Sequence, residues 1–364
     1  MNPPGTISSA GQPAARTTPP TARGHAKVRA RRAPARRWKI LLTVGLSLLM
    51  IAGLGGIALR ALVARYDQSV VKEQLLDPHA RREHATVTGP LNYLLIGSDQ
   101  RAGNPDAGQR SDTIMIAHLP AGLDRAYLLS VPRDLLVEIP ADAASGYAGG
   151  TDKINAAFQF GNGGRDGSRL LSATLTRLTG IRFDGAAIID FTGFHRVIDL
   201  VGGVQMCVDT PVRSIHTGTM FDPGCRDMDG AQALDYARQR YGLPDGDYDR
   251  QRHQQQLLRA ILDRVADTDL MTNPVKLDQV IRGVGSALTV DTNGLPTEDL
   301  VFALRGLRPD DLAGIRLPTY SETIDDTSYD RLDAEADGLF RALRGSDLAD
   351  WVGAHPEWVN HLSG

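Results

Sequence analysis

The stretches "LNYLLIGSDQ" (residues 91–100), "SDTIMIAHL" (111–119) and "AYLLSVPRD" (126–134) decide the fold of this chain. Each contains a run of apolar residues bounded by Gly, Pro or Asp, a pattern that is typical of a buried β-strand. We therefore predict three strands, at Leu91–Gly97, Asp112–Leu119 and Ala126–Val131. Their short connections allow the strands to run up, down and up within one sheet.

Charged residues stand where these strands begin or end. In the up-down-up order, the loop 98–111 and the end of the third strand meet at one edge of the sheet. The charged residues of that edge are Asp99, Arg101, Arg110, Asp112, Arg133 and Asp134. An ordinary solvated loop explains any one of them, whereas the convergence of the whole set predicts a binding site.

A second charged cluster is "ARQRYGLPDGDYDRQRHQQQ" at residues 237–256. Arg238 and Arg240 are two positions apart, so a helix would separate them, whereas an extended chain places both on one side. Arg250 and Gln254 are four positions apart on a helical stretch and therefore share a face. We expect this cluster to join the charged edge of the sheet.

The rest of the chain alternates helical and strand patterns. We expect helices at Ile154–Phe160, Arg169–Thr179, Thr192–Val201, Gly230–Ala237 and Asp249–Ala266, and strands at Ala186–Asp190 and Val204–Asp209. Mixed elements of this kind predict an α/β fold, a layered α/β/α domain with a mixed central sheet. No linker or internal repeat divides the chain after Pro90.

The N-terminal region predicts a membrane anchor. Residues 1–39 hold nine Lys or Arg and no acid, which indicates a disordered basic tail. Residues 40–59 then run without a charge, long enough for one N-terminal transmembrane helix at about 1.5 Å per residue. The basic flank orients the tail to the cytoplasm. A cleaved signal peptide ending near "ALVA" (61–64) is the alternative.

These features divide the chain into five parts. They are a cytoplasmic tail at 1–39, a single-pass anchor in the cell membrane at 40–62, a stalk at 63–89, an extracellular domain at 90–348 and a C-terminal tail at 349–364. The two cysteines, Cys207 and Cys225, then lie in an oxidising compartment, where a disulfide is expected. Residues 40–364 hold 31 Lys plus Arg against 43 acids, which excludes nucleic acid as an expected partner.

The residue types in the two clusters indicate phosphate chemistry. Paired carboxylates hold a hard divalent cation, and arginines bind phosphate oxygens in bidentate pairs. The sequence has no Gly-rich nucleotide loop ending in Lys and Ser or Thr, and no serine elbow with His and Asp partners. These observations favour phosphoryl transfer on a metal-bound pyrophosphate without ATP.

At these residues the chain resembles the LytR-CpsA-Psr family of cell-wall glycopolymer transferases. The matching runs are "NYLLIGSDQR", "RSDTIMI", "SVPRD", "DKINAAF", "FTGFHRVIDLVGGV", "LDYARQR" and "GDYDRQRHQQQ", in that order. The resemblance implies an enzyme that moves a polymer phosphate from a polyprenyl-pyrophosphate carrier to a hydroxyl of peptidoglycan. The cysteine pair resembles that of actinobacterial members.

The resemblance also implies a role for each matching residue. Asp99 and Asp112 would hold Mg²⁺ or Mn²⁺, and the catalytic set would be Asp99, Asp112, Arg133 and Asp134. The pyrophosphate would be surrounded by Arg101, Arg110, Arg133, Lys153, Asn155, Arg238, Arg240, Arg250 and Gln254. His253 stands where many members carry Arg, which removes one expected phosphate contact.

An apolar tunnel for the polyprenyl tail is also implied, with the helix 169–179 and Phe194, Val197 and Ile198 as candidate walls. Three questions stay open. Asp99, Asp112 and Asp134 are all candidates for the general base. The polymer can be teichoic acid, arabinogalactan or capsule. A metal-dependent pyrophosphate hydrolase and a non-enzymatic lipid-binding regulator of wall synthesis are the alternative functions.

Overall fold

The central element of the computed structural model is a mixed eight-stranded sheet. The structure describes residues 71–83, 87–98, 110–267, 288–296 and 306–362, with the single positions 279, 283, 299 and 304. The strand order is β1-β12-β7-β2-β3-β4-β13-β16. The bounds are β1 Val71–Lys72, β2 Leu91–Ser98, β3 Ser111–Leu119, β4 Ala126–Ser130, β7 Gly185–Asp190, β12 Leu288–Asp291, β13 Leu312–Arg316 and β16 Val359–Asn360.

The three predicted strands are confirmed as β2, β3 and β4. β3 pairs antiparallel with both neighbours, so the chain runs up, down and up, and β2 also pairs parallel with β7. Because side chains alternate along a strand, the pair Leu94 and Ile116 faces one side of the sheet and the pair Leu95 and Met115 faces the other. We call these sides the closed face and the open face.

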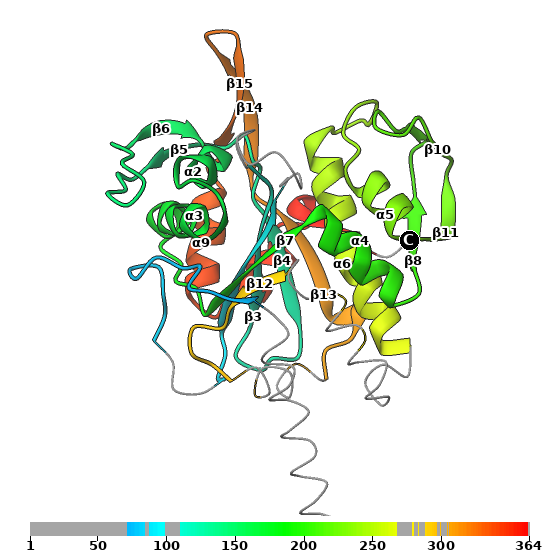
Figure 1. Cartoon of the computed structure of the whole chain (residues 1–364), viewed down its shortest axis with the longest axis horizontal. Helices are drawn as coiled ribbons and strands as arrows, with labels where there is room; N and C mark the ends of the chain where they lie inside the picture. Colours follow the sequence, from blue (N-terminus) through cyan, green and yellow to red (C-terminus); the bar gives the residue numbers. More distant parts are fainter. Residues whose placement is uncertain are drawn as a thin grey trace, which may run out of the picture. The chain divides into compact units, whose positions relative to one another are not determined.

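The closed face is filled by helices. Helices α2 (Ile154–Phe160), α3 (Gly164–Thr179), α9 (Ala336–Arg344) and α10 (Leu348–Ala354) contribute to one core cluster with Leu94 and Ile116. Figure 1 shows α2, α3 and α9 together on one side of the sheet. Leu175 of α3 is fully buried in this cluster, as are its neighbours Leu170 and Leu171.

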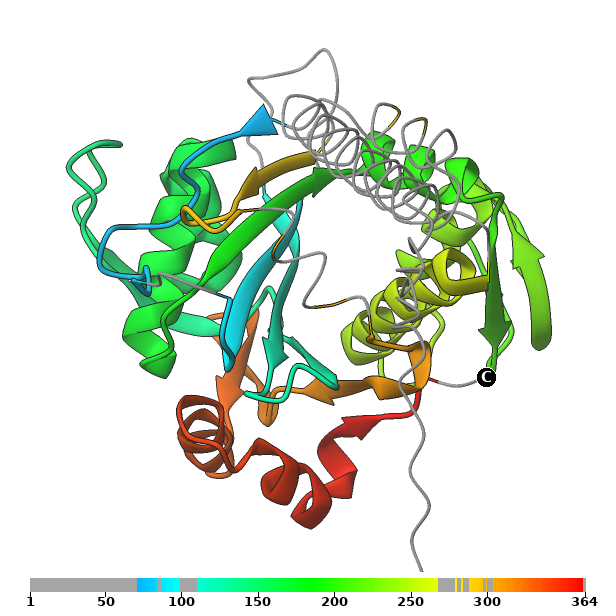
Figure 2. The same ribbon diagram turned by 90° about the horizontal axis from the view of Figure 1, so that it is seen from below.

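The open face is covered by α4 (Phe191–Leu200), α5 (Gly230–Ala237) and α6 (Asp247–Asp267), as Figure 2 shows from below. These helices have a core cluster of their own, which includes Ile198 and Tyr236. A capping box at Asp229 and Gln232 begins α5, because each side chain bonds the other residue's backbone N–H. The three predicted helices of this layer are confirmed, and so is the layered α/β fold.

Paired strands outside the large sheet extend the domain. Their bounds are β5 Leu136–Ile139, β6 Gly150–Lys153, β8 Val204–Val208, β9 Val212–Arg213, β10 Met220–Phe221, β11 Gly224–Met228, β14 Thr319–Ile324 and β15 Thr327–Leu332. β8 pairs with β11 with Cys207 opposite Cys225, and a disulfide joins them as predicted. The hairpin of β14 and β15 projects from the domain (Figure 1). Two 3₁₀ turns are η4 Pro309–Asp311 and η5 Pro356–Trp358.

The ends of the domain differ from the prediction. Residues 71–83 were expected in a stalk, but β1 pairs with β12 and Leu75 and Leu76 are fully buried in the closed-face core. Residues 349–362 were expected in a tail, but β16 pairs with β13. The apolar residues of both segments are removed from water only when they pack against the sheet. The predicted tail and anchor at 1–62 lie outside the described residues, and none of the helices described is long and apolar enough to span a bilayer.

Candidate functional site

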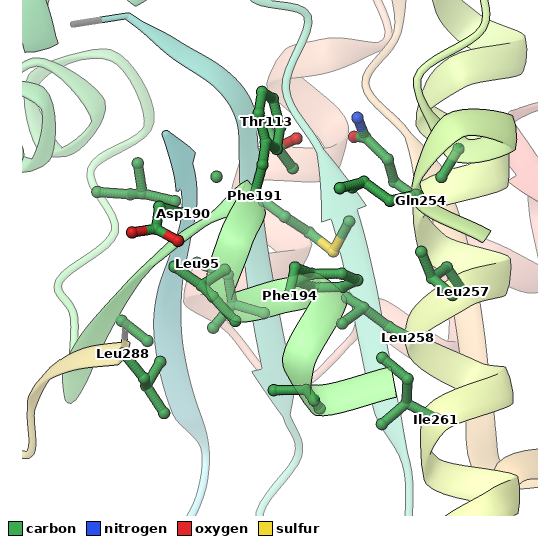
Figure 3. A pocket seen from close by; sticks show the side chains of 18 of the residues that line it. Leu95, Thr113, Asp190, Phe191, Phe194, Gln254, Leu257, Leu258, Ile261 and Leu288 are labelled. Atoms are coloured by element: carbon green, nitrogen blue, oxygen red, sulfur yellow. The ribbon is translucent and has the colours of Figure 1, made fainter. Parts of the chain in front are cut away.

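An apolar cavity lies between the open face of the sheet and its helices. Its volume is about 310 Å³, and its walls come from β2, β3, β7, β12, α4, α5 and α6. Figure 3 shows Leu95, Phe194 and Leu258 pointing into it from three different elements. Because nearly all of its walls are apolar, the cavity suits a hydrocarbon chain.

A polar pocket of about 250 Å³ opens beside this cavity. The two spaces share the wall residues Thr113, Phe191, Arg238 and Gln254. The polar pocket is lined by Asp112, Thr113, Arg133, Phe191, Ile215, His216, Arg238, Arg240, Tyr241, Arg250 and Gln254. Four arginines and one carboxylate therefore face a space that adjoins an apolar one.

Asp112 and Arg133 are joined as the strand order predicts. An Arg133 Nη1 donates to Asp112 Oδ1 at 2.6 Å, and its Nε donates to Asp134 Oδ2 at 3.4 Å. Lys153 Nζ also donates to Asp134, at 2.7 Å. Burial acts to raise the pKa of Asp134, but the Lys153 hydrogen bond and the charge of Arg133 outweigh it and lower that pKa. Asp134 therefore holds the two cations in place and does not itself line the pocket.

Arg250 is the most deeply placed cation of the polar pocket. Its Nη2 lies 2.7 Å from Asp247 Oδ1 and donates to the backbone oxygen of Asp112 at 3.3 Å. Burial lowers the pKa of Arg250, and Asp247 partly offsets this effect. Its buried Nε has no hydrogen-bond partner among the residues that the structure describes. A buried donor of this kind is costly unless a ligand or water accepts its proton.

Arg238 and Arg240 both line the pocket because α5 ends at Ala237. The intervening Gln239 points the opposite way and is fully buried, where its Nε2 donates to Asp235 and Ser214. Arg238 lies over the ring of Phe191, at 4.2 Å from its centroid, at the boundary between the two spaces. The predicted end of the helix at Ala237 is confirmed, whereas the backbone of Arg238 is αR (φ −98°, ψ −9°) and not extended.

Several predicted residues lie elsewhere. Arg110 is exposed and donates from Nε to Gln159 of α2 at 3.0 Å, so it belongs to the closed-face side. Lys153 bonds Asp134, and Asn155 is buried on α2, where its N–H donates to the Arg133 oxygen. In the described structure, these three residues do not line the polar pocket. Asp99 and Arg101 lie outside the described residues.

The sequence patterns missed part of the pocket wall. Ile215 and His216 belong to the loop that the disulfide closes, and Tyr241 follows Arg240. Burial, followed by the charge of Arg238, lowers the pKa of His216. The cysteine spacing could have indicated that this loop has a fixed place, but not which side of it faces the pocket.

The predicted walls of the lipid tunnel are partly wrong. Phe194 and Val197 line the apolar cavity as expected, whereas Ile198 is fully buried in the core of the helical layer. The helix 169–179, now α3, lies on the closed face, so its leucines do not reach the cavity. His253 is also buried in the helical layer, where Tyr236 lies 3.0 Å from its Nε2, so it is no replacement for a phosphate ligand.

The described carboxylates fit a divalent cation only in part. Asp112 lines the pocket and uses Oδ1 to accept from Arg133, and Ser98, which precedes Asp99, pairs with Ser111 beside Asp112. A carboxylate pair at this position is the ligand type that Mg²⁺ prefers. Among the residues described, however, no group of three or more His, Cys, Asp or Glu forms a complete metal site.

Most of the chain matches the sequence model of a known protein family. The model of the LytR_cpsA_psr family matches residues 61–341. The chain therefore belongs to this family. This match includes both charged clusters and every strand that lines the cavity.

Curated relatives agree with this assignment. LcpB of Corynebacterium glutamicum is 34% identical over 56% of this chain and 49% of its own length. The cell wall biosynthesis protein LcpA of the same organism is 28% identical over 56% of this chain and 45% of its own length. The chain thus spans about half the length of these two curated relatives.

Solved structures share the fold. TagV of B. subtilis is 26% identical and has a TM-score of 0.57, with 72% of this chain and 98% of that chain covered. A structure of TagT bound to LIIa-WTA is 22% identical, with a TM-score of 0.56 over 75% of this chain and 99% of that one. At this identity the TagT structure supports the fold alone.

Proposed function

We propose that this protein is a phosphotransferase that moves a glycopolymer phosphate from a polyprenyl-pyrophosphate carrier to a peptidoglycan hydroxyl. One observation carries the proposal: a pocket with four arginines shares a wall with an apolar cavity. The proposed donor is an apolar chain joined to a pyrophosphate, so its two parts match the apolar cavity and the arginine pocket beside it. The bound state of TagT and the names of the relatives agree with a role in wall assembly.

The donor would lie with its hydrocarbon against Leu95, Phe194 and Leu258 and its pyrophosphate among the arginines. Arg238, at the boundary, would contact the phosphate nearest the lipid. Arg250, whose buried Nε lacks an acceptor in the described structure, would donate to a phosphate oxygen. Such donors stabilise the negative charge that develops during phosphoryl transfer.

In the proposed reaction the acceptor oxygen attacks the phosphorus that carries the polymer. The bond from that phosphorus to the bridging oxygen breaks, and polyprenyl phosphate leaves with the bond's electron pair. A carboxylate takes the proton of the attacking hydroxyl. Asp134 is poorly suited to this step because Lys153 and Arg133 hold it and lower its pKa, which leaves Asp99 and Asp112 as candidates.

Asp112, with Asp99, would hold Mg²⁺ or Mn²⁺. The cation would supply additional positive charge to the phosphate oxygens. Arg133 would position Asp112, because it bonds Asp112 and Asp134 at the same time. Asp134 and Lys153 would therefore support the site as a second layer.

The test is to incubate the protein with a polyprenyl-pyrophosphate glycan, peptidoglycan fragments and Mg²⁺, and to identify the products by mass spectrometry. We expect polymer joined to the fragments and release of polyprenyl phosphate. Free polymer phosphate as the sole product would favour the hydrolase. Donor binding without any turnover would favour the lipid-binding regulator. The name of a related Staphylococcus aureus protein, the regulatory protein MsrR, agrees with this alternative.

The metal is tested by Asp112→Asn, which removes a charge at nearly constant shape. We expect binding of Mn²⁺, followed by its paramagnetic signal, and turnover both to fall steeply in a folded protein. Asp166→Asn on α3 is the matched control, since Asp166 is an acid of the closed-face side. Full Mn²⁺ binding by Asp112→Asn would remove this residue from the metal site.

The proposed location is outside the cell membrane, with residues 40–62 as a single-pass anchor and the N-terminus in the cytoplasm. The basic tail before this apolar segment supports that orientation. Protease added to intact spheroplasts should remove the domain. Protection until the membrane is permeabilised would contradict the orientation.

A further inference from the structure

A third feature stands beside the polar pocket, at the edge of the same sheet. Arg316 ends β13 and pairs in register with Ser130 of β4, three positions before Arg133. Its guanidinium lies between two rings, 4.8 Å from the centroid of Tyr248 and 4.7 Å from that of Trp358. All three side chains are half-buried, so the group is in reach of solvent.

Both rings are held in place by other contacts. The Tyr248 hydroxyl lies 2.9 Å from Thr319 Oγ1, and Trp358 Nε1 donates to Glu335 Oε2 at 2.9 Å. Because the guanidinium lies over both rings, their contacts restrict where it can move, as ring contacts do for arginines in recognition sites. A charge restricted in this way loses little conformational freedom when it binds a ligand.

Among the residues that the structure describes, the guanidinium of Arg316 has no hydrogen-bond acceptor. Its Nε is buried without a hydrogen-bond partner, and no hydrogen bond or ion pair joins its other donors to a residue that the structure describes. The nearby acids have partners of their own, since Asp247 pairs with Arg250 at 2.7 Å and Asp330 accepts from Ser321 at 2.9 Å. A buried donor without an acceptor is destabilising unless a ligand or water supplies one.

The position of Arg316 indicates which ligand it would meet. The apolar cavity lies over β7, β2 and β3, and the polar pocket lies at the ends of β3 and β4. β13 is the next strand, and Tyr248 is two residues before Arg250 on α6. Along the sheet, the order is therefore apolar cavity, phosphate pocket and Arg316.

We propose that Arg316, Tyr248 and Trp358 form a second oxyanion subsite, on the side of the phosphate pocket away from the lipid. It binds a singly charged carboxylate or phosphodiester of the glycan substrates. The proposal rests on the proposed function for the identity of those substrates. Two sources carry this chemistry: the carboxylates of the peptidoglycan acceptor and the phosphodiesters of the donor polymer.

Equilibrium binding tests the subsite without requiring turnover. Three probes are titrated calorimetrically: a peptidoglycan fragment with free carboxylates, the same fragment with its carboxylates amidated, and a lipid-free phosphodiester glycan. Arg316→Gln should weaken binding of one anionic probe roughly 10- to 100-fold, the effect of one charge-assisted hydrogen bond. Weaker binding of the peptidoglycan fragment would show that Arg316 binds a carboxylate of the acceptor. Weaker binding of the phosphodiester glycan would show that it binds a phosphodiester of the donor polymer. If the acceptor is the source, amidation should weaken wild-type binding similarly and have no further effect on the variant.

Matched variants keep the test specific. Arg177→Gln removes an arginine of the closed face that pairs with Glu138, and it should leave all three affinities unchanged. Trp358→Leu retains the charge but removes one ring, so its binding should fall between wild type and Arg316→Gln. Thermal unfolding verifies that each variant is folded. Unchanged binding of both anionic probes by folded Arg316→Gln would overturn the subsite.

The outcome is separable from that of the proposed function. If the wild-type protein transfers polymer and Arg316→Gln binds both anionic probes as tightly as wild type, the transferase proposal stands and the subsite proposal fails. If Arg316→Gln binds an anionic probe more weakly and the wild-type protein shows no transfer, the subsite proposal stands and the transferase proposal fails.

Discussion

The two faces of the central sheet carry similar apolar side chains but leave different amounts of space. On the closed face, Leu94 and Ile116 pack under α2 and α3 in one continuous core. On the open face, the neighbouring Leu95 and Met115 line a cavity of about 310 Å³. The helices of the open face bury their own core around Ile198 and Tyr236, so they stay folded without closing over the strands. An apolar strand pattern therefore does not reveal whether packing or a ligand covers each face.

The largest effect should separate Leu175 of the closed face from Leu258 of the open face. Leu175→Asp places a charge in a fully buried position, and we expect the free energy of unfolding to fall by more than about 4 kcal/mol. Leu258→Asp should leave the fold intact and abolish binding of an uncharged polyprenyl analogue, because Leu258 lines the cavity. Denaturant unfolding and lipid-binding measurements on both variants test this comparison. Equal destabilisation of the two variants would contradict it.

The next effect concerns the arginines at the end of the cavity. Arg238→Lys keeps a charge but loses the planar fork that stacks on Phe191, so turnover should fall roughly 30- to 1,000-fold, about 2–4 kcal/mol of transition-state stabilisation. Binding of the uncharged polyprenyl analogue should not change. Arg177→Lys on the closed face is the control, and wild-type turnover by Arg238→Lys would argue against the phosphate role.

The disulfide should matter on the open-face side alone. Replacing Cys207 and Cys225, which are separated by 18 positions, with Ser opens the loop between them and should lower the free energy of unfolding by about 3 kcal/mol. Because Ile215 and His216 lie within that loop and line the pocket, the Michaelis constant for the donor should also rise. Free-thiol labelling of the denatured, unreduced wild type should give no signal, and two labelled thiols would contradict the bond.

A more gradual effect should appear as the pH falls. Burial lowers the pKa of His253 in the helical layer and of His118 in the sheet from 6.5 to about 4. The unfolded chain therefore binds more protons between pH 6.5 and 4, so the contribution of each histidine to stability is complete above this window and is lost as the pH falls through it, by up to about 3 kcal/mol for each histidine. His253→Gln should remove the part of the pH dependence of the free energy of unfolding that comes from His253. An unchanged slope in urea unfolding between pH 7 and 5 would show that His253 does not titrate in this way.

The sequence alone predicted the elements whose signal is local. The helix at Ile154–Phe160 and the end of a helix at Ala237 agree with the structure because periodicity and capping residues act within a few positions. The clustering of Asp112 and Arg133 was also predictable, since an antiparallel meander returns its ends to one edge, and the family resemblance adds Arg250 to this cluster. Arg110 was misplaced because its position depends on Gln159 of a helix from the closed-face side.

The charged and polar composition around residues 71–83 predicts a stalk, and residues 349–362 fall in the predicted C-terminal tail. Only pairing with β12 and β13 makes them strands of the domain. Ile215, His216 and Arg316 were missed as candidate site residues for a related reason. Their roles come from the neighbours that tertiary contacts supply, which are a disulfide-closed loop in one case and two rings from distant segments in the other.

The sequence by itself determined the chemistry of this protein: arginines and carboxylates at strand and helix ends, in the order of a known family. The tertiary structure decided which face of the sheet stays open, and therefore which apolar residues line a cavity. Leu175 and Leu258 are both leucines at helical spacing, and only the packing of their helices separates a core residue from a cavity wall. Hydrophobic burial has no direction of its own, whereas hydrogen bonds and charges do, and for this reason the polar part of the site was the more predictable.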